Sequence, residues 1–293
     1  MSGVEEPVRP PVGVPEPSAA TPPAAVVPAM RRLLWVAAAL VFLAGVQLFA
    51  FPLRTDRYFA WTIDSPMTAV FLGASYWSAI GLEAGAARAR LWGEARIAVP
   101  AVLVFTTLTL VVTLVHLDRF HLDGDLDLST RAVTWLWIGV YVAVPVLTVL
   151  AWLAQRRTST AVPRPSGLPV AVRIVLVALA AVLLAMGAAL LVAPGWADAA
   201  WPWPLTPLTG RAIGAWLVGL GTAAGHAVLL DDRDSLRPLA ITGVAFGALQ
   251  TVALVRHGDE LDWGRPSAAI YVATLVLLTT VSVWALLPAR RTP

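Results

Sequence analysis

The chain contains no cysteine, no lysine and no asparagine among its 293 residues. Without cysteine it can form no disulfide, no thiolate metal site and no cysteine nucleophile. Its 21 basic residues are all arginine, and this bias, together with many alanines and prolines, indicates a GC-rich bacterial genome. Charge of either sign is also scarce: 13% of the residues are charged, against about 25% in soluble domains.

Apolar sequence is what the chain has in abundance. It is 58% hydrophobic, and its mean hydropathy is +0.74. The apolar runs are about twenty residues long, which is enough for a helix to cross a bilayer core of roughly 30 Å. We therefore expect an all-α integral membrane protein with eight transmembrane helices. The predicted spans lie near residues 33–51, 66–86, 97–115, 131–154, 171–193, 208–230, 238–255 and 267–287.

The arginines predict how these helices are oriented. With a cytoplasmic N-terminus, thirteen arginines flank the helices on the inner side and seven on the outer side, as the positive-inside rule requires. Both termini are then cytoplasmic, in a bacterial inner membrane. The pI near 9.9 is explained by these orientation signals, so we expect the lipid bilayer and no nucleic acid as a partner.

The chain is organised around a stretch that occurs twice. The segment from Trp201 to Trp216 has an earlier counterpart from Trp61 to Ala74, and each opens a long apolar run. Matched residues stand 142 positions apart at first and 141 apart after one deleted residue. The pairs are Gly45 with Gly187, Pro52 with Pro194, Asp56 with Asp198, Trp61 with Trp203, Thr68 with Thr209, Gly73 with Gly214, Arg96 with Arg237, Phe105 with Phe246, His116 with His257, and Asp118 with Asp259.

This periodicity predicts two tandem four-helix repeats. Because each repeat has an even number of spans, both copies face the same way, as a parallel repeat. The predicted domains are a disordered proline-rich cytoplasmic tail at 1–30, a first repeat at 31–157, a proline-rich linker at 158–170 and a second repeat at 171–293.

One predicted helix carries a stripe of polar residues. Thr106, Thr109, Thr113 and His116 are spaced three, four and three residues apart, which places them on one helix face. The equivalent positions of the seventh helix are Gly247, Gln250, Leu254 and His257. Two interpretations stay open: a polar path through the membrane, or packing in which threonines bond their own helix and Gln250 bonds a neighbour.

Histidine and carboxylate residues meet at the outer ends of those two helices. His116 is followed by Asp118, and His257 is followed by Asp259. Such pairs can bind a divalent cation or relay protons, whereas the plainer interpretation is a solvated acidic loop. Paired haem ligation by the two histidines is a third interpretation.

Glu83 and His226 are isolated titratable residues near the cytoplasmic ends of the second and sixth predicted helices. A carboxylate at that depth is unfavourable unless it reaches the interface or a partner. Arg88 or Arg90 would make Glu83 part of a structural ion pair, and the other interpretation is a role in gating or proton movement.

Trp61, Trp201 and Trp203 are expected to form an aromatic belt at the outer membrane interface. The sequence has no phosphate-binding glycine loop, no nucleophile elbow and no H-E-x-x-H motif. We therefore expect no enzymatic activity and no cofactor.

The segment from Trp203 to Trp216, with Asp232, Arg237-Pro238 and Asp262-Trp263, resembles a pattern in bacterial multi-pass membrane proteins that have no established activity. The resemblance implies an integral membrane location. Two functions remain: a small permease or channel with a path between the repeats, or a scaffold that binds partner membrane proteins. Homo-oligomerisation is also expected to be possible, through small-residue helix faces.

Overall fold

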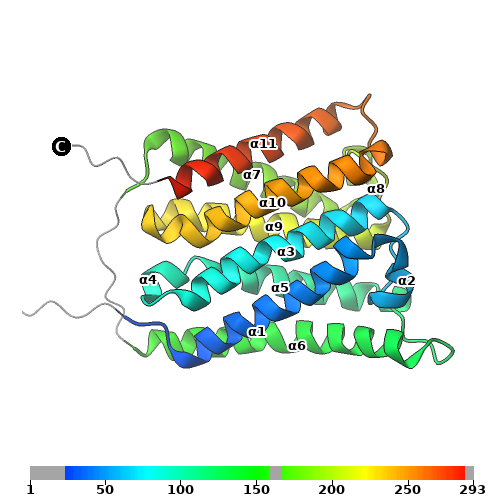
Figure 1. Ribbon diagram of the computed structural model, residues 1–293, viewed down its shortest axis with the longest axis horizontal. Helices are drawn as coiled ribbons and strands as arrows, with labels where there is room; N and C mark the ends of the chain where they lie inside the picture. Colours follow the sequence, from blue (N-terminus) through cyan, green and yellow to red (C-terminus); the bar gives the residue numbers. More distant parts are fainter. Residues whose placement is uncertain (1–23, 159–166, 288–293) are drawn as a thin grey trace, which may run out of the picture.

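The computed structural model describes residues 24–158 and 167–287, and the regular elements in these ranges are helices (Figure 1). Most of the predicted tail and linker therefore lies outside the described residues. The long helices are α1 (Pro28–Gly45), α3 (Pro66–Arg88), α5 (Ala98–Val115), α6 (Leu128–Arg156), α7 (Val170–Val192), α9 (Pro207–Leu230), α10 (Arg237–His257) and α11 (Pro266–Leu286). The short ones are η1 (Val46–Ala50), η2 (Pro52–Arg54), α2 (Thr55–Tyr58), α4 (Trp92–Ala95), η3 (Leu117–Arg119), α8 (Pro194–Ala199), η4 (Asp234–Leu236) and η5 (Gly258–Glu260).

Seven helical segments of the described chain are long and apolar enough to cross a membrane, against the eight expected. They are Pro28–Ala50, Trp92–Val115, Leu128–Arg156, Val170–Val192, Pro207–Leu230, Asp234–Glu260 and Pro266–Leu286. The eighth expected span is α3, which has 23 residues. Its buried residues include Ser75, Ser78 and Glu83, and these polar side chains lower the hydropathy of the helix. They are tolerated because the helix packs against protein on most sides.

Proline and hydroxyl residues set where several helices begin. Proline at the first helical turn lacks only an N–H that has no partner there, so it starts α1, α3, α9 and α11 at no cost in hydrogen bonds. The Ser65 hydroxyl accepts the backbone N–H of Thr68 at the start of α3. At the equivalent start of α9, Thr206 and Thr209 form a capping box.

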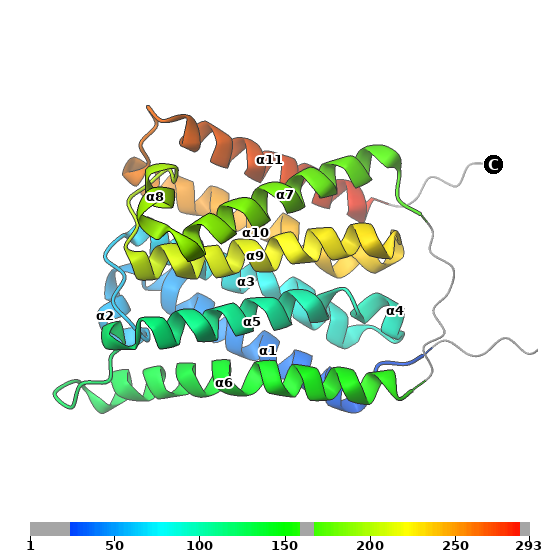
Figure 2. The same ribbon diagram turned by 180° about the vertical axis from the view of Figure 1, so that it is seen from behind.

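The long helices lie side by side in two rows. Figure 1 shows the front row as α1, α3, α10 and α11, and Figure 2 shows the back row as α6, α5, α9 and α7. Neighbours within each row pack together, and contacts between α1 and α6 and between α7 and α11 join the outer members of the rows. The beginning of α1 and the end of α11 lie at the same end of the bundle (Figure 1).

The two halves of the chain are interlocked at the centre of the bundle. Helix α3 of the first half packs on α10 of the second, and α9 of the second half packs on α5 of the first. Glycine allows close approach within each half. A Cβ on Gly73 would lie 2.5 Å from the backbone nitrogen of Phe49, and one on Gly187 would lie 2.8 Å from the carbonyl oxygen of Gly214.

The three expected belt tryptophans are buried, so the prediction of an interfacial belt is wrong. Trp61, Trp201 and Trp203 are 3%, 5% and 2% exposed. They belong to aromatic clusters at the end of the bundle that is predicted to face outward, and Trp203 Nε1 donates to the Thr68 hydroxyl across 2.9 Å, from one half of the chain to the other. Tertiary packing turns all three side chains inward.

Chain segments close the opposite end of the bundle. Residues 24–27 pair with the turn before α4, where Trp92 N donates to the Ala24 carbonyl. The Gln155 side chain holds the same segment through the backbone of Ala25 and Val27. This end corresponds to the predicted cytoplasmic side.

Two lateral grooves as the candidate functional site

The threonine stripe on α5 lies inside the bundle and is bonded to its own helix. Thr106, Thr109 and Thr113 donate to the carbonyl oxygens of Val102, Phe105 and Thr109, at 2.7, 2.9 and 2.8 Å. All three side chains are buried. The cavity that Thr109 and Thr113 line has a volume of about 10 Å³, which is room for one water molecule at most and not for a continuous file of water.

Gln250 is bonded to two neighbouring helices. Its Nε2 donates to the Phe71 carbonyl of α3 at 3.1 Å, and its Oε1 accepts from the Tyr271 hydroxyl of α11 at 3.1 Å. The side chain is fully buried. The amide therefore holds three helices together, and the hydrogen bonds match the packing interpretation of the polar stripe.

The two residues of the first predicted histidine–carboxylate pair contact other residues and not each other. His116 lies just beyond α5, where its Nε2 is 2.8 Å from Nη1 of Arg211 at the beginning of α9. Burial and the neighbouring Arg211 lower the pKa of His116, so its neutral form accepts from the guanidinium. Asp118 forms an exposed ion pair with Arg119.

The second pair is likewise not assembled as a site. His257 Nε2 is buried without a hydrogen-bond partner, and Asp259 is exposed. Among the described residues no three histidine, aspartate or glutamate side chains are grouped as metal ligands. The nearby Glu260 accepts from the Ser65 hydroxyl at 2.6 Å and from Met67 N at 2.9 Å.

Glu83 and His226 are not brought together by a hydrogen bond or ion pair. His226 contacts the backbone of Ile97. Glu83 is 5% exposed, and its Oε2 has no hydrogen-bond partner. Arg88, one of its two expected partners, stacks on Trp35 with its guanidinium carbon 4.8 Å from the ring centre.

The residues that surround open space belong to two lateral grooves that sequence did not predict. The first groove, of about 230 Å³, lies between α1 and α6, and residues of α3 and α5 form its floor. Its α6 wall consists of Val133, Leu136, Trp137, Val140, Tyr141 and Val144. Leu43 and Leu136 on its rim are half-exposed, which indicates that the groove opens on the apolar flank of the bundle.

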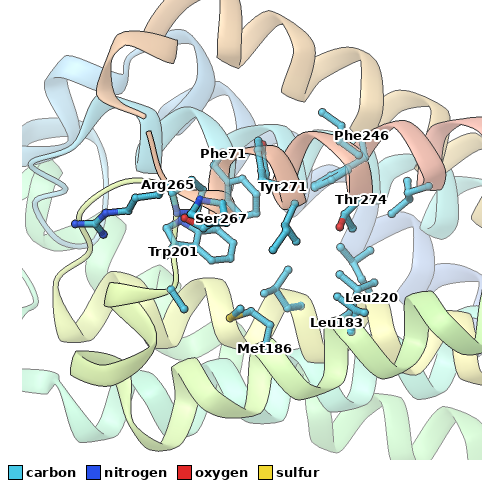
Figure 3. A pocket seen from close by; sticks show the side chains of 18 of the residues that line it. Phe71, Leu183, Met186, Trp201, Leu220, Phe246, Arg265, Ser267, Tyr271 and Thr274 are labelled. Carbon is cyan, nitrogen blue, oxygen red and sulfur yellow. The ribbon is translucent and has the colours of Figure 1, made fainter. Parts of the chain in front are cut away.

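The second groove, of about 420 Å³, lies between α7 and α11, and residues of α9 and α10 form part of its floor. Its α11 wall consists of Pro266, Ser267, Ile270, Tyr271, Thr274, Leu275 and Leu278. Figure 3 shows Trp201, Arg265 and Ser267 gathered at one end, with Leu183, Leu220 and Thr274 toward the other. The groove is thus mainly apolar along its length, with Arg265 and Ser267 at one end.

The two grooves are lined by equivalent residues. Six of the seven α11 residues of the second groove each stand 134 positions after one of the six α6 residues of the first. On α1 and α7 the offset is 142 positions, where Leu40, Val41 and Ala44 match Val182, Leu183 and Met186. The same face of the same helix is hollowed in each half of the chain.

The grooves differ in the polar groups they hold. The first contains Glu83 and a pair of buried tyrosines, Tyr76 and Tyr141, whose hydroxyl oxygens are 2.8 Å apart. The residue 141 positions after Glu83 is Ala224, which lines a small apolar cavity of about 50 Å³ at the foot of the second groove. The carboxyl is therefore present in one copy alone.

The chain matches no protein-family model, no curated protein and no solved structure. The resemblance to bacterial multi-pass membrane proteins stays a prediction. A functional assignment accordingly rests on the chemistry of the grooves.

Proposed function

We propose that the protein is an eight-helix inner-membrane protein made of two parallel repeats, with α3 as the span additional to the seven apolar ones. The order of elements supports the repeat: α3 and α9 begin 141 residues apart, at Pro66 and Pro207, and short helices follow at matching places. The crossed packing of α3 on α10 and α9 on α5 is what a two-fold axis along the membrane normal produces. The arginine pattern supports a cytoplasmic location for both termini.

Within this framework we propose a small permease for amphiphilic molecules that enter sideways from the bilayer. The observation that carries the proposal is the pair of equivalent grooves, each walled by apolar and aromatic side chains and rimmed by half-exposed apolar residues. Small-molecule sites typically have mainly apolar walls and volumes of roughly 300–1,000 Å³. The second groove, of about 420 Å³, lies in this range, and the first, of about 230 Å³, is smaller.

The polar stripe gives less support to an aqueous channel between the repeats. Its threonine hydroxyls are engaged by their own helix, and a ring pair of Phe105 and Trp216, with centres 4.0 Å apart, fills the adjoining interior. A path for water needs polar groups that are free to form hydrogen bonds with the water in turn.

The proposal is tested by photo-crosslinking in lipid nanodiscs. The probe is a dodecyl chain that carries a diazirine and ends in a hydroxyl group. Val140→Trp fills the first groove and Thr274→Trp fills the equivalent position of the second. Val142→Trp and Val276→Trp are matched controls, because these residues are half-exposed on the same two helices and line neither groove.

We expect cross-links on Trp137 and Tyr271, lost selectively in the corresponding groove-filling variant and kept in both controls. Liposomes that contain the protein should also speed the movement of a fluorescent single-chain phospholipid between leaflets. Cross-links that are absent from both grooves, or that survive both fillings, would overturn the proposal.

The second candidate is a scaffold that receives a partner's membrane helix in these grooves. The observation that favours it is the exposure of α11, which buries only Ala268 and Leu275 in the bundle. Occupied grooves without any leaflet-to-leaflet movement of the phospholipid would favour this scaffold over the permease.

A further inference from the structure

The carboxyl of Glu83 lies between two cavities. It lines the first groove, and it also lines a smaller cavity of about 40 Å³ inside the bundle, together with Trp216 and Thr242. The side chain is 95% buried, which follows from its 5% exposure, and Oε2 has no hydrogen-bond partner. Burying a carboxyl without a partner is unfavourable in free energy. A bound ligand or a proton would offset this cost at Glu83.

No cationic side chain among the described residues neutralises Glu83. The described ion pairs involve Asp118, Asp231 and Asp262. Arg88, which is five residues along α3, lies on the Trp35 ring instead. A positive charge that pairs with Glu83 must therefore arrive from outside this part of the chain.

The walls around Glu83 suit a particular kind of cation. Phe105, Trp137 and Tyr141 line the same groove and present aromatic rings, whose faces attract organic ammonium groups. The half-exposed rim at Leu43 and Leu136 leads from the apolar flank of the bundle into the groove. A carboxyl, aromatic rings and an apolar entrance together complement a molecule with an ammonium head and a hydrocarbon chain.

We propose that the first groove binds a cationic amphiphile, with the ammonium head paired with Glu83 and the chain lying along the α1 and α6 walls. This inference rests on the proposed function, because it takes the groove to be a ligand site and adds its selectivity. The second groove has no carboxyl, and Ala224, the residue 141 positions after Glu83, lines the small cavity beside it, so this groove has no such selectivity for ammonium.

The test compares two probes that differ only in the head group. Both are diazirine-bearing dodecyl chains, one ending in trimethylammonium and the other in hydroxyl, and both are applied to the full chain in nanodiscs. Glu83→Gln keeps the shape of the side chain and removes its charge. Glu94→Gln is the matched control, since Glu94 is exposed in α4 and lines neither groove.

In the wild type, the ammonium probe should label the first groove at lower concentration than the hydroxyl probe. Glu83→Gln should weaken ammonium binding by about tenfold and leave hydroxyl binding unchanged, because only the charge pair is lost. Glu94→Gln should change neither. Thermal unfolding checks that each variant is folded.

Three outcomes would overturn the inference or its basis. Ammonium binding by Glu83→Gln at wild-type strength shows that the carboxyl does not recognise the head. Equal weakening of both probes shows that Glu83 shapes the groove instead of selecting charge. If the hydroxyl probe labels no groove in the wild type, the proposed function itself fails.

Discussion

Arg211 donates a hydrogen bond from Nη1 to Nε2 of His116 across 2.8 Å, and this contact joins the beginning of α9 to the residue that follows α5. The residue 141 positions before Arg211 is Val70, and His257, 141 positions after His116, has no partner for its buried Nε2. The corresponding ends of α3 and α10 are therefore not joined by such a contact.

The His116–Arg211 contact predicts a pH-dependent stability. Burial and Arg211 lower the pKa of His116 below its ordinary 6.5, so the unfolded chain binds more protons than the folded one as the pH falls. The stabilisation of the fold by neutral His116 is fully present above pH 6.5 and is lost as the pH falls below that value. We expect the Tm in detergent to fall by about 2 °C between pH 7.5 and pH 5.5 through this contact.

His116→Gln should remove this part of the pH dependence, because glutamine still accepts from Arg211 and does not titrate. His257→Gln serves as the control and should retain the wild-type slope. Identical slopes for all three proteins would show that the contact does not depend on protonation of His116.

Glu260 predicts a second stability effect, at the start of α3. Its carboxylate accepts from the Ser65 hydroxyl at 2.6 Å and from Met67 N at 2.9 Å, and it reaches α3 from the other half of the chain. Glu260→Gln should lower stability by about 1–2 kcal/mol, since one acceptor oxygen and the charge at a helix N-terminus are lost. Thermal unfolding in detergent measures the effect, and Asp259→Asn at the exposed neighbouring carboxylate should be near neutral. Equal losses in the two variants would contradict the capping role.

Hydropathy alone predicted the positions of the long helices, including α3 at 66–86, but α3 is not among the seven segments of the described chain that are apolar enough to cross a membrane. The span predicted at 131–154 is observed at Leu128–Arg156, and the one predicted at 208–230 is observed at Pro207–Leu230. Helix α3 carries polar residues that are tolerated because neighbouring helices, and not lipid, surround it. The same cause explains the buried tryptophans: a sequence places a residue along the helix axis, whereas packing decides which way it faces.

The grooves could not be predicted from the sequence because no motif encodes them. Each wall consists of ordinary apolar residues from several helices, and the space between them exists only after α1 packs against α6, or α7 against α11. Glu83 was the exception, because a lone carboxylate in an apolar run is visible in a sequence. Its expected arginine partner was absent since Arg88 stacks on Trp35.

Close helix packing predicts that Gly73 cannot be replaced without loss of stability. A Cβ at this position would lie 2.5 Å from the Phe49 backbone nitrogen, so α3 and η1, which continues α1, would have to separate. Gly73→Ala should cost about 1–3 kcal/mol, as overpacking in a closely packed interior does. Gly139→Ala is the matched control on α6, where an added Cβ meets no atom within 4 Å, and it should gain up to about 1 kcal/mol from helix propensity. Tolerance of Gly73→Ala would mean that the two helices pack less closely than described.

The threonine stripe predicts different effects for two similar substitutions. Thr109 donates only to its own helix, so Thr109→Val should change stability by less than about 0.5 kcal/mol. The Thr113 hydroxyl also accepts from Trp137 Nε1 at 3.1 Å, and Thr113→Val leaves that buried N–H without a partner, at a cost of about 1–3 kcal/mol. Thermal unfolding separates the two variants. Proton and ion flux through liposomes provides the functional measurement, because an aqueous path along the stripe requires both hydroxyls. If Thr109→Val abolished a flux while leaving stability intact, the stripe would be a transport path and not a packing surface.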